Sequence, residues 1–72
     1  MVGMNIFGIK TLNADIRIHE RNDDSKFAVL ELISNGEDGQ ITRATYFFDS
    51  PDELMAVIEK IHAQLSQQLG LI

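Results

Sequence analysis

Residues 27 to 34, FAVLELIS, form a strongly apolar segment near the middle of a chain of 72 residues. In an extended strand, successive side chains point to opposite faces of the sheet. Alternation therefore divides the segment into two largely apolar sets, Phe27, Val29, Glu31 and Ile33 against Ala28, Leu30, Leu32 and Ser34. Such a strand needs cover on both faces. A chain of this length has room for about one covering helix, so we expect one apolar face to remain open to a partner.

The composition indicates one small globular domain over residues 1–72. Hydrophobic residues make up 44% of the chain and charged residues 24%, which are ordinary values for a folded domain. A domain of this size buries only about 60% of the surface of its unfolded chain. Because the chain has no cysteine, disulfides and thiolate zinc sites cannot add stability. A partner subunit is the remaining common device, so we expect a protein partner or a homodimer.

The charge balance disfavours direct nucleic-acid binding. Six basic against eleven acidic side chains give a net charge of −5, and the basic residues are scattered. No apolar run approaches the roughly 20 residues that cross a bilayer, and the opening residues lack the features of a secretory signal. We therefore expect a cytoplasmic protein without membrane contact. An acidic mimic of nucleic acid remains an alternative, based on Asp23, Asp24, Glu37, Asp38, Asp49, Asp52 and Glu53.

The segment SPDEL at residues 50–54 marks the start of a helix. Ser50 suits the N-cap, Pro51 suits the first turn, and Glu53 completes an S-x-x-E capping box. The helix is predicted over about residues 51–69 and closed by Gly70. One stripe of apolar residues follows it at spacings of three and four: Leu54, Val57, Ile58, Ile61, Leu65 and Leu69.

Upstream of the helix, the hydrophobic pattern has the period of two that is typical of strands. Strands are predicted at about 14–20, 27–34 and 40–48, joined by polar or glycine-rich turns. Connections this short allow only antiparallel pairing. Residues 4–10 are predicted as a fourth, edge strand, with TLNAD as the turn that follows it. The fold class is therefore α+β, an antiparallel meander of three to four strands with one amphipathic C-terminal helix on one face.

The strand pattern leaves two choices for the face beneath the helix. If Ala28, Leu30 and Leu32 face the helix, the reverse face mixes apolar and charged residues as protein contact patches do. We predict partner binding there, by Arg17, His19, Val29, Glu31, Ile33, Arg43 and Phe47. In the opposite choice, Phe27, Val29, Ile33 and Phe47 lie under the helix and Leu30 and Leu32 are left uncovered. An open apolar face follows from either choice.

The sequence contains two candidate constellations for chemistry. His19 and Glu31 would lie on the same face of neighbouring strands, where a carboxylate can tune a histidine for acid–base work. Glu59 and His62 have the E-x-x-H spacing of carboxylate-bridged metal sites, but those sites need further pairs. We interpret both as surface or interface polar pairs, and expect no catalytic, metal-binding or cofactor-binding residues.

Three segments at the joints of this pattern, DIRIHE, SKFAVLE and FFDSPDEL, resemble those of small phage anti-CRISPR proteins. The resemblance is to the inhibitors of type I-F surveillance complexes and covers about residues 4 to 58. It implies a non-enzymatic inhibitor of phage or prophage origin, which applies its sheet face to a protein subunit and denies access to nucleic acid. Glu31 matches a glutamate of that sheet face, whereas His19 stands where the family has a tyrosine.

The expected function is that of a small non-enzymatic protein-binding or regulatory module that acts through an exposed sheet face. A homodimer could stack two such faces, or could add the N-terminal strand to the sheet edge of a second copy. Two alternatives stay open. One is a small oligomeric enzyme with a site around His19 and Glu31, and the other is an accessory structural subunit of a larger assembly.

Overall fold

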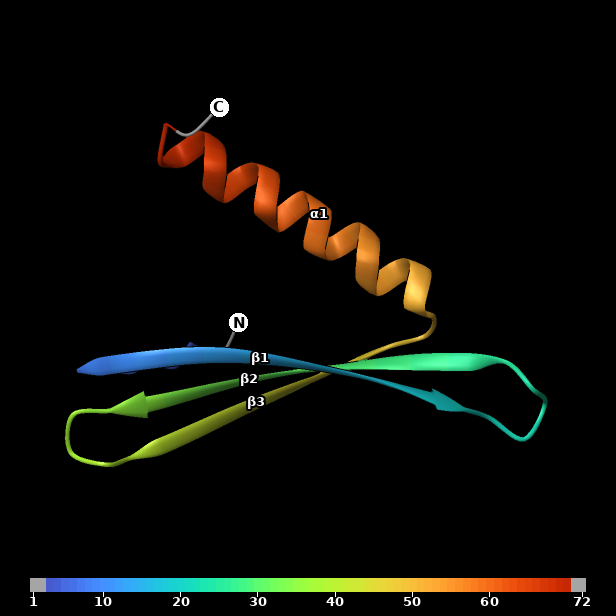
Figure 1. The fold of residues 1–72 in the computed structure, drawn as a ribbon, viewed down its shortest axis with the longest axis horizontal. Helices are drawn as coiled ribbons and strands as arrows, with labels where there is room; N and C mark the ends of the chain where they lie inside the picture. Colours follow the sequence, from blue (N-terminus) through green and yellow to red (C-terminus); the bar gives the residue numbers. More distant parts are fainter. Residues whose placement is uncertain (1–2, 71–72) are drawn as a thin grey trace.

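A computed structural model describes residues 3–70 of the chain as a sheet and one helix. The three strands are antiparallel and adjacent in chain order, which confirms the predicted α+β meander (Figure 1). The elements are β1 (Ile9–Glu20), β2 (Lys26–Gly36), β3 (Ile41–Phe48) and α1 (Pro51–Gln68). The central strand is β2, whose residues are largely buried or half-buried, while every residue of β1 is exposed.

Two tight turns set the pairing of the strands. Between β1 and β2, the backbone N–H of Arg21 donates to the carbonyl of Ser25 at 2.8 Å, and Asp24 adopts a φ of 68°. Between β2 and β3, the N–H of Gly36 donates to the carbonyl of Gln40 at 2.8 Å. Short turns of this kind hold neighbouring strands antiparallel and fix which residues lie opposite each other.

The prediction of a fourth strand at residues 4–10 is wrong. The chain turns at Gly8, whose φ is 66° and whose carbonyl accepts a hydrogen bond from the N–H of Glu37 at 2.9 Å. From Ile9 onward, β1 runs through the predicted turn TLNAD without leaving the sheet. The reason lies in β2, which at 11 residues is long enough to pair with this segment, apart from an irregularity between Ile9 and Thr11.

The helix begins and ends where its capping residues predict. Ser50 is the N-cap, and its side-chain oxygen accepts a hydrogen bond from the backbone N–H of Glu53 at 3.2 Å. Pro51 occupies the first helical position, where its missing N–H leaves no bond unmade. At the other end, the N–H of Gly70 donates to the carbonyl of Gln67 at 3.1 Å, and Gly70 has a φ of 73°. Glycine adopts this conformation without strain.

The two faces of the sheet differ in composition, and α1 lies over the one that contains Ala28. Ala28 is 0% exposed and Leu54 of α1 is 1% exposed, so the core lies between β2 and the first turns of the helix. We call this side of the sheet the helix face; the register places on it Leu12, Ala14, Ile16, Ile18, Ala28, Leu30, Leu32, Ser34, Thr42, Ala44, Tyr46 and Phe48. Of the two choices that the sequence leaves, the structure adopts the first.

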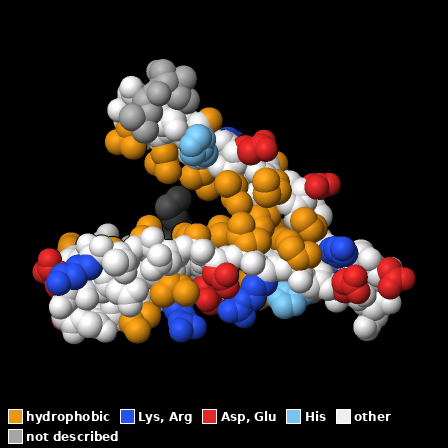
Figure 2. Space-filling view, in the orientation of Figure 1, with side chains coloured by type: hydrophobic (Ala, Val, Ile, Leu, Met, Phe, Trp, Pro, Cys, Tyr) orange, Lys and Arg blue, Asp and Glu red, His pale blue; other side chains and the backbone are white. Residues whose placement is uncertain are grey.

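The helix covers only part of this face. Its first turns lie close to the sheet, and its later turns rise away, so that a wedge opens between them (Figures 1 and 2). Ile61, Leu65 and Leu69 follow Leu54 along the same stripe, yet they are 46%, 54% and 72% exposed. The apolar stripe of α1 is therefore buried at its start and open to solvent at its end.

The N-terminal residues also lie on the helix side of the sheet. Met4 and Ile6 line an open groove of about 480 Å³ together with residues of the helix face, among them Leu32 and Tyr46. The described part of the N-terminal segment, residues 3–8, therefore leaves the reverse side of the sheet uncovered.

Candidate protein-binding face

The side of the sheet opposite α1, called the open face here, carries all the residues predicted to bind a partner. The register aligns Arg17 with Val29 and Phe47 in one cross-strand row. Glu31 lies in the adjacent row, between Asp15 and Thr45, and the next row joins Ile33 to Arg43. His19 lies opposite Phe27 at the end of the same face. The meander thus gathers residues from 17 to 47 onto one surface, as strand alternation predicts.

Phe47 is the most exposed apolar residue of this surface. Its side chain is 74% exposed, although its neighbour across the row, Val29, is half-buried. Figure 2 shows hydrophobic, cationic, acidic and histidine side chains together along this side of the sheet. A shallow hollow of about 200 Å³ lies at the centre, lined by Asp15, Arg17, His19, Val29, Glu31, Thr45 and Phe47. The face is therefore an uneven surface with an apolar centre and charged surroundings.

Two polar contacts order the charged groups beside Phe47. Arg17 Nε donates to Asp15 Oδ2 at 3.0 Å, and Thr45 Oγ1 donates to Glu31 Oε2 at 3.4 Å. Both contacts are solvent-exposed, so they contribute little to folding stability. Asp15 and Thr45 are absent from the set of residues predicted to bind a partner. Strand alternation could have added them, because it places Asp15 on the same face as Arg17, and Thr45 on the same face as Phe47.

His19 contacts an aromatic ring and lies apart from Glu31. Its imidazole stacks on Phe27, with ring centroids 5.2 Å apart and an interplanar angle of 25°. The residue opposite Glu31 on β1 is Asp15, four positions from His19. That offset corresponds to about 13 Å along the strand. The two residues share a face, as predicted, but the register offsets them along it, so they are not direct cross-strand neighbours.

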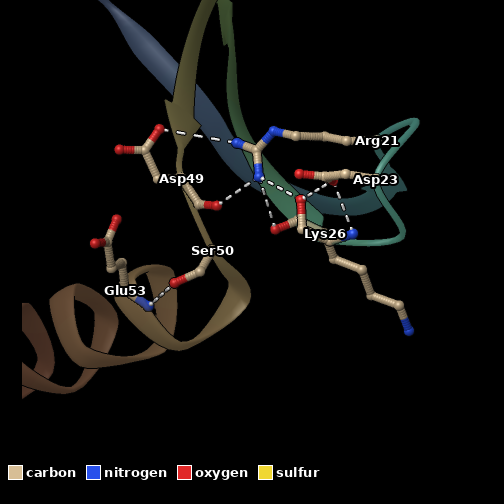
Figure 3. A network of polar contacts seen from close by, with 7 residues as sticks. Arg21, Asp23, Lys26, Asp49, Ser50 and Glu53 are labelled. Atoms are coloured by element: carbon tan, nitrogen blue, oxygen red, sulfur yellow. Dashed lines mark hydrogen bonds and ion pairs between the residues drawn. The ribbon is translucent and has the colours of Figure 1, made fainter.

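Arg21 organises a polar junction at the end of the sheet where α1 begins (Figure 3). Its Nη1 donates to the backbone carbonyl of Asp49 at 3.1 Å and to the carbonyl of Lys26 at 3.3 Å. The same atom donates to Ser25 Oγ at 3.3 Å, and the guanidinium carbon lies 5.2 Å from the Phe27 ring centroid. Arg21 thus ties the β1–β2 turn to the β3–α1 connection. Sequence reasoning missed this role, because no local pattern relates residues so far apart.

The turn beside Arg21 holds the carboxylate of Asp23 through two hydrogen bonds from Ser25. Asp23 Oδ1 accepts hydrogen bonds from Ser25 Oγ at 2.6 Å and from the Ser25 backbone N–H at 3.0 Å. The Ser25 hydroxyl, followed by its backbone N–H, holds the pKa of Asp23 below its usual value. Both donors favour the charged form of the carboxylate.

The described residues offer little for metal or membrane chemistry. Glu59 and His62 lie on exposed turns of α1, and nowhere in residues 3–70 do three or more potential ligands gather around one point. Within the same residues, no helix has the length and apolar content needed to cross a bilayer.

Over the described residues, the fold is that of a small α+β protein with one sheet and one helix, and the open face mixes apolar and charged residues. No protein-family model, curated protein or solved structure matches this chain.

Proposed function

We propose that this protein is a small non-enzymatic binding module that engages another protein through its open face. The observation that carries the proposal is the 74% exposure of Phe47 beside Val29, with Arg17 and Glu31 close by. Exposed aromatic and arginine side chains around an apolar centre are typical of the residues that dominate protein interfaces. Because a hydrogen-bonded sheet carries these residues, their ordering on binding costs little.

The resemblance to anti-CRISPR proteins gives the proposal a specific form. In that form the partner is a subunit of a nucleic-acid-processing complex, and the bound module obstructs access to nucleic acid. The acidic balance of the chain, with a net charge of −5, supports contact with a basic protein surface of this kind. Phage or prophage origin and a cytoplasmic partner belong to the same proposal. Binding to a purified type I-F complex, with loss of its DNA binding, tests this form directly.

Affinity capture from cells of the natural host tests the general proposal. We expect the wild-type protein to retain a partner and Phe47→Ala to lose most of it, since the exposed ring supplies the central contact. Met55→Ala is the matched control, because it removes another exposed apolar side chain, 51% exposed, from α1 instead of the open face. Equal capture by all three proteins would contradict the proposal, and a fixed stoichiometry with a large assembly would identify an accessory subunit.

The alternative of an oligomeric enzyme around His19 and Glu31 makes a different prediction. His19→Ala with Glu31→Ala should weaken association with the partner if the open face is an interface. In an enzyme, the same double variant should keep its assembly and lose turnover. The offset of about 13 Å between the two positions along the strand direction favours the first outcome, since direct proton transfer needs hydrogen-bond contact.

A further inference from the structure

The chain exposes far more surface than a compact monomer of its mass. Its accessible area is 6160 Å² for 8.1 kDa, whereas a monomeric protein of that mass exposes about 4,500 Å². The radius of gyration is 15.0 Å, against about 11 Å for a compact chain of this length. The excess of about 1,700 Å² is larger than the roughly 800 Å² that each partner buries in a standard interface.

Much of the exposed apolar surface lines the wedge between α1 and the helix face. Ile61 and Leu65 lie on the stripe that begins with buried Leu54, so they project toward the sheet without reaching it. On the other side of the wedge, Leu12 is 66% exposed and Tyr46 is 50% exposed, and both line the groove of about 480 Å³. On one side of the wedge, the apolar stripe of α1 has no sheet packed against it. On the other side, part of the helix face has no helix packed over it.

The start of α1 is tied closely to the end of the sheet. Only Asp49 and Ser50 separate β3 from α1. The Asp49 carbonyl accepts a hydrogen bond from Arg21, and Ser50 caps the first turn. Closure of the helix onto its own sheet would require a change of backbone angles at this short connection.

A second copy of the chain supplies what each side of the wedge lacks. Under a two-fold axis, the later turns of each helix can pack on the uncovered helix face of the other copy, as Leu54 already packs within one chain. On the helix face, the four cross-strand rows that begin at Leu12, Ala14, Ile16 and Ile18 contain no charged residue, so contact there buries no charged side chain of the sheet. In such a dimer, the helix stripe of each copy meets the uncovered helix face of the other. A partner of another sequence would need two different surfaces, one that fits the stripe and one that fits the sheet.

We propose that the protein forms a homodimer in which the second half of α1 and its C-cap, from Ile61 to Leu69, dock into the wedge of the partner copy. The two dimers considered from sequence stack the open faces or add the N-terminal strand to the sheet edge of a second copy, whereas this one uses the helix side of the sheet. It leaves Phe47 and the open face free for another protein. The proposal therefore stands independently of the proposed function.

The mass in solution, measured by light scattering with a charge introduced on each surface, tests the proposal. We expect wild type to show twice the 8.1 kDa mass of one chain at micromolar concentration. Leu65→Glu should raise the dimer dissociation constant about a hundredfold or more, because the change occurs twice in each dimer. Gln67→Glu on the opposite side of α1 is the matched control and should leave the mass unchanged. Phe47→Glu should also leave it unchanged.

An isotope-filtered NOE measurement on mixed labelled and unlabelled wild-type protein tests the geometry without any variant. Contacts between methyl groups of Leu65 in one copy and Leu12 in the other are expected. A monomeric mass at high concentration would overturn the proposal, as would contacts of this pair within one chain only, which mean that α1 closes on its own sheet. A dimer broken by Phe47→Glu and kept by Leu65→Glu would overturn it in favour of stacked open faces.

Discussion

The guanidinium of Arg21 donates a hydrogen bond to the backbone carbonyl of Asp49, 28 residues further along the chain, at 3.1 Å. Asp49 also places a carboxylate oxygen 3.8 Å from the same guanidinium. This contact joins the turn after β1 to the residue that precedes the cap of α1. The position of the helix on the sheet thus depends on a side chain that belongs to neither the core nor the helix.

Replacing Arg21 should therefore destabilise the fold more than its exposure suggests. Arg21→Ala removes hydrogen bonds to two carbonyls and the contact with Phe27, and should lower the free energy of unfolding by about 1 to 2 kcal/mol. Urea denaturation measures the loss. Arg17→Ala is the control, since it breaks only an exposed pair with Asp15 and should cost less than about 0.5 kcal/mol. Equal losses in the two variants would contradict the assigned role.

The cap of α1 should contribute measurably to stability. Ser50→Ala removes the acceptor for the N–H of Glu53 and should lower the free energy of unfolding by about 1 kcal/mol. Thermal unfolding followed by circular dichroism measures the change. Ser50→Asp keeps an acceptor at the cap and should remain close to wild type. If the alanine and aspartate variants unfold at the same temperature, the hydrogen bond makes no net contribution to the free energy of unfolding.

Leu54 should be the most sensitive apolar position on the helix. It is the largest fully buried side chain, and Leu54→Ala should lower the free energy of unfolding by about 2 to 4 kcal/mol. Such a loss is a large part of the stability of a small domain. Met55→Ala, one residue away but exposed, should change the same quantity by less than about 0.5 kcal/mol. A similar response at both positions would mean that Leu54 is not buried in solution.

The lowered pKa of Asp23 predicts that the free energy of unfolding depends on pH. Its pKa is lower in the folded protein than in the unfolded chain, so the stabilisation is fully present above the ordinary value of 3.8. It is lost as the pH falls through the lower, folded value. The stability difference between wild type and Asp23→Asn should therefore be constant near neutral pH and shrink in acid.

Asp24→Asn is the control for this pH dependence. Asp24 lies in the same turn with a φ of 68°, a conformation that asparagine tolerates well. This substitution should leave stability unchanged or slightly higher at neutral pH. An acid-dependent difference that is larger for Asp24→Asn than for Asp23→Asn would contradict the contribution assigned to Ser25 and Asp23.

Local signals predicted most of the elements. Ser50 and Gly70 mark the ends of α1 because capping involves only residues within one turn. The short turns after β1 and β2 required an antiparallel meander. Alternation placed Arg17, Val29 and Phe47 on one face before any pairing was known.

The errors arose where a distant segment decided the outcome. TLNAD has the composition of a turn, yet it is a strand because β2 extends far enough to pair with it. Gly8 turns the chain instead, fixed by a hydrogen bond from Glu37 in another turn. In the candidate site, His19 and Glu31 share a face as predicted, but the register between strands separates them.

The sequence by itself determined the order of the elements, the ends of the helix and the division of each strand into two faces. These properties depend on side-chain periodicity and on contacts within a few residues. Only the tertiary structure decided which face lies under α1 and how far along that face the helix remains in contact. A pattern of apolar residues predicts which surface of an element will be buried. What covers that surface depends on packing between residues far apart in the chain, such as Leu54 and Ala28.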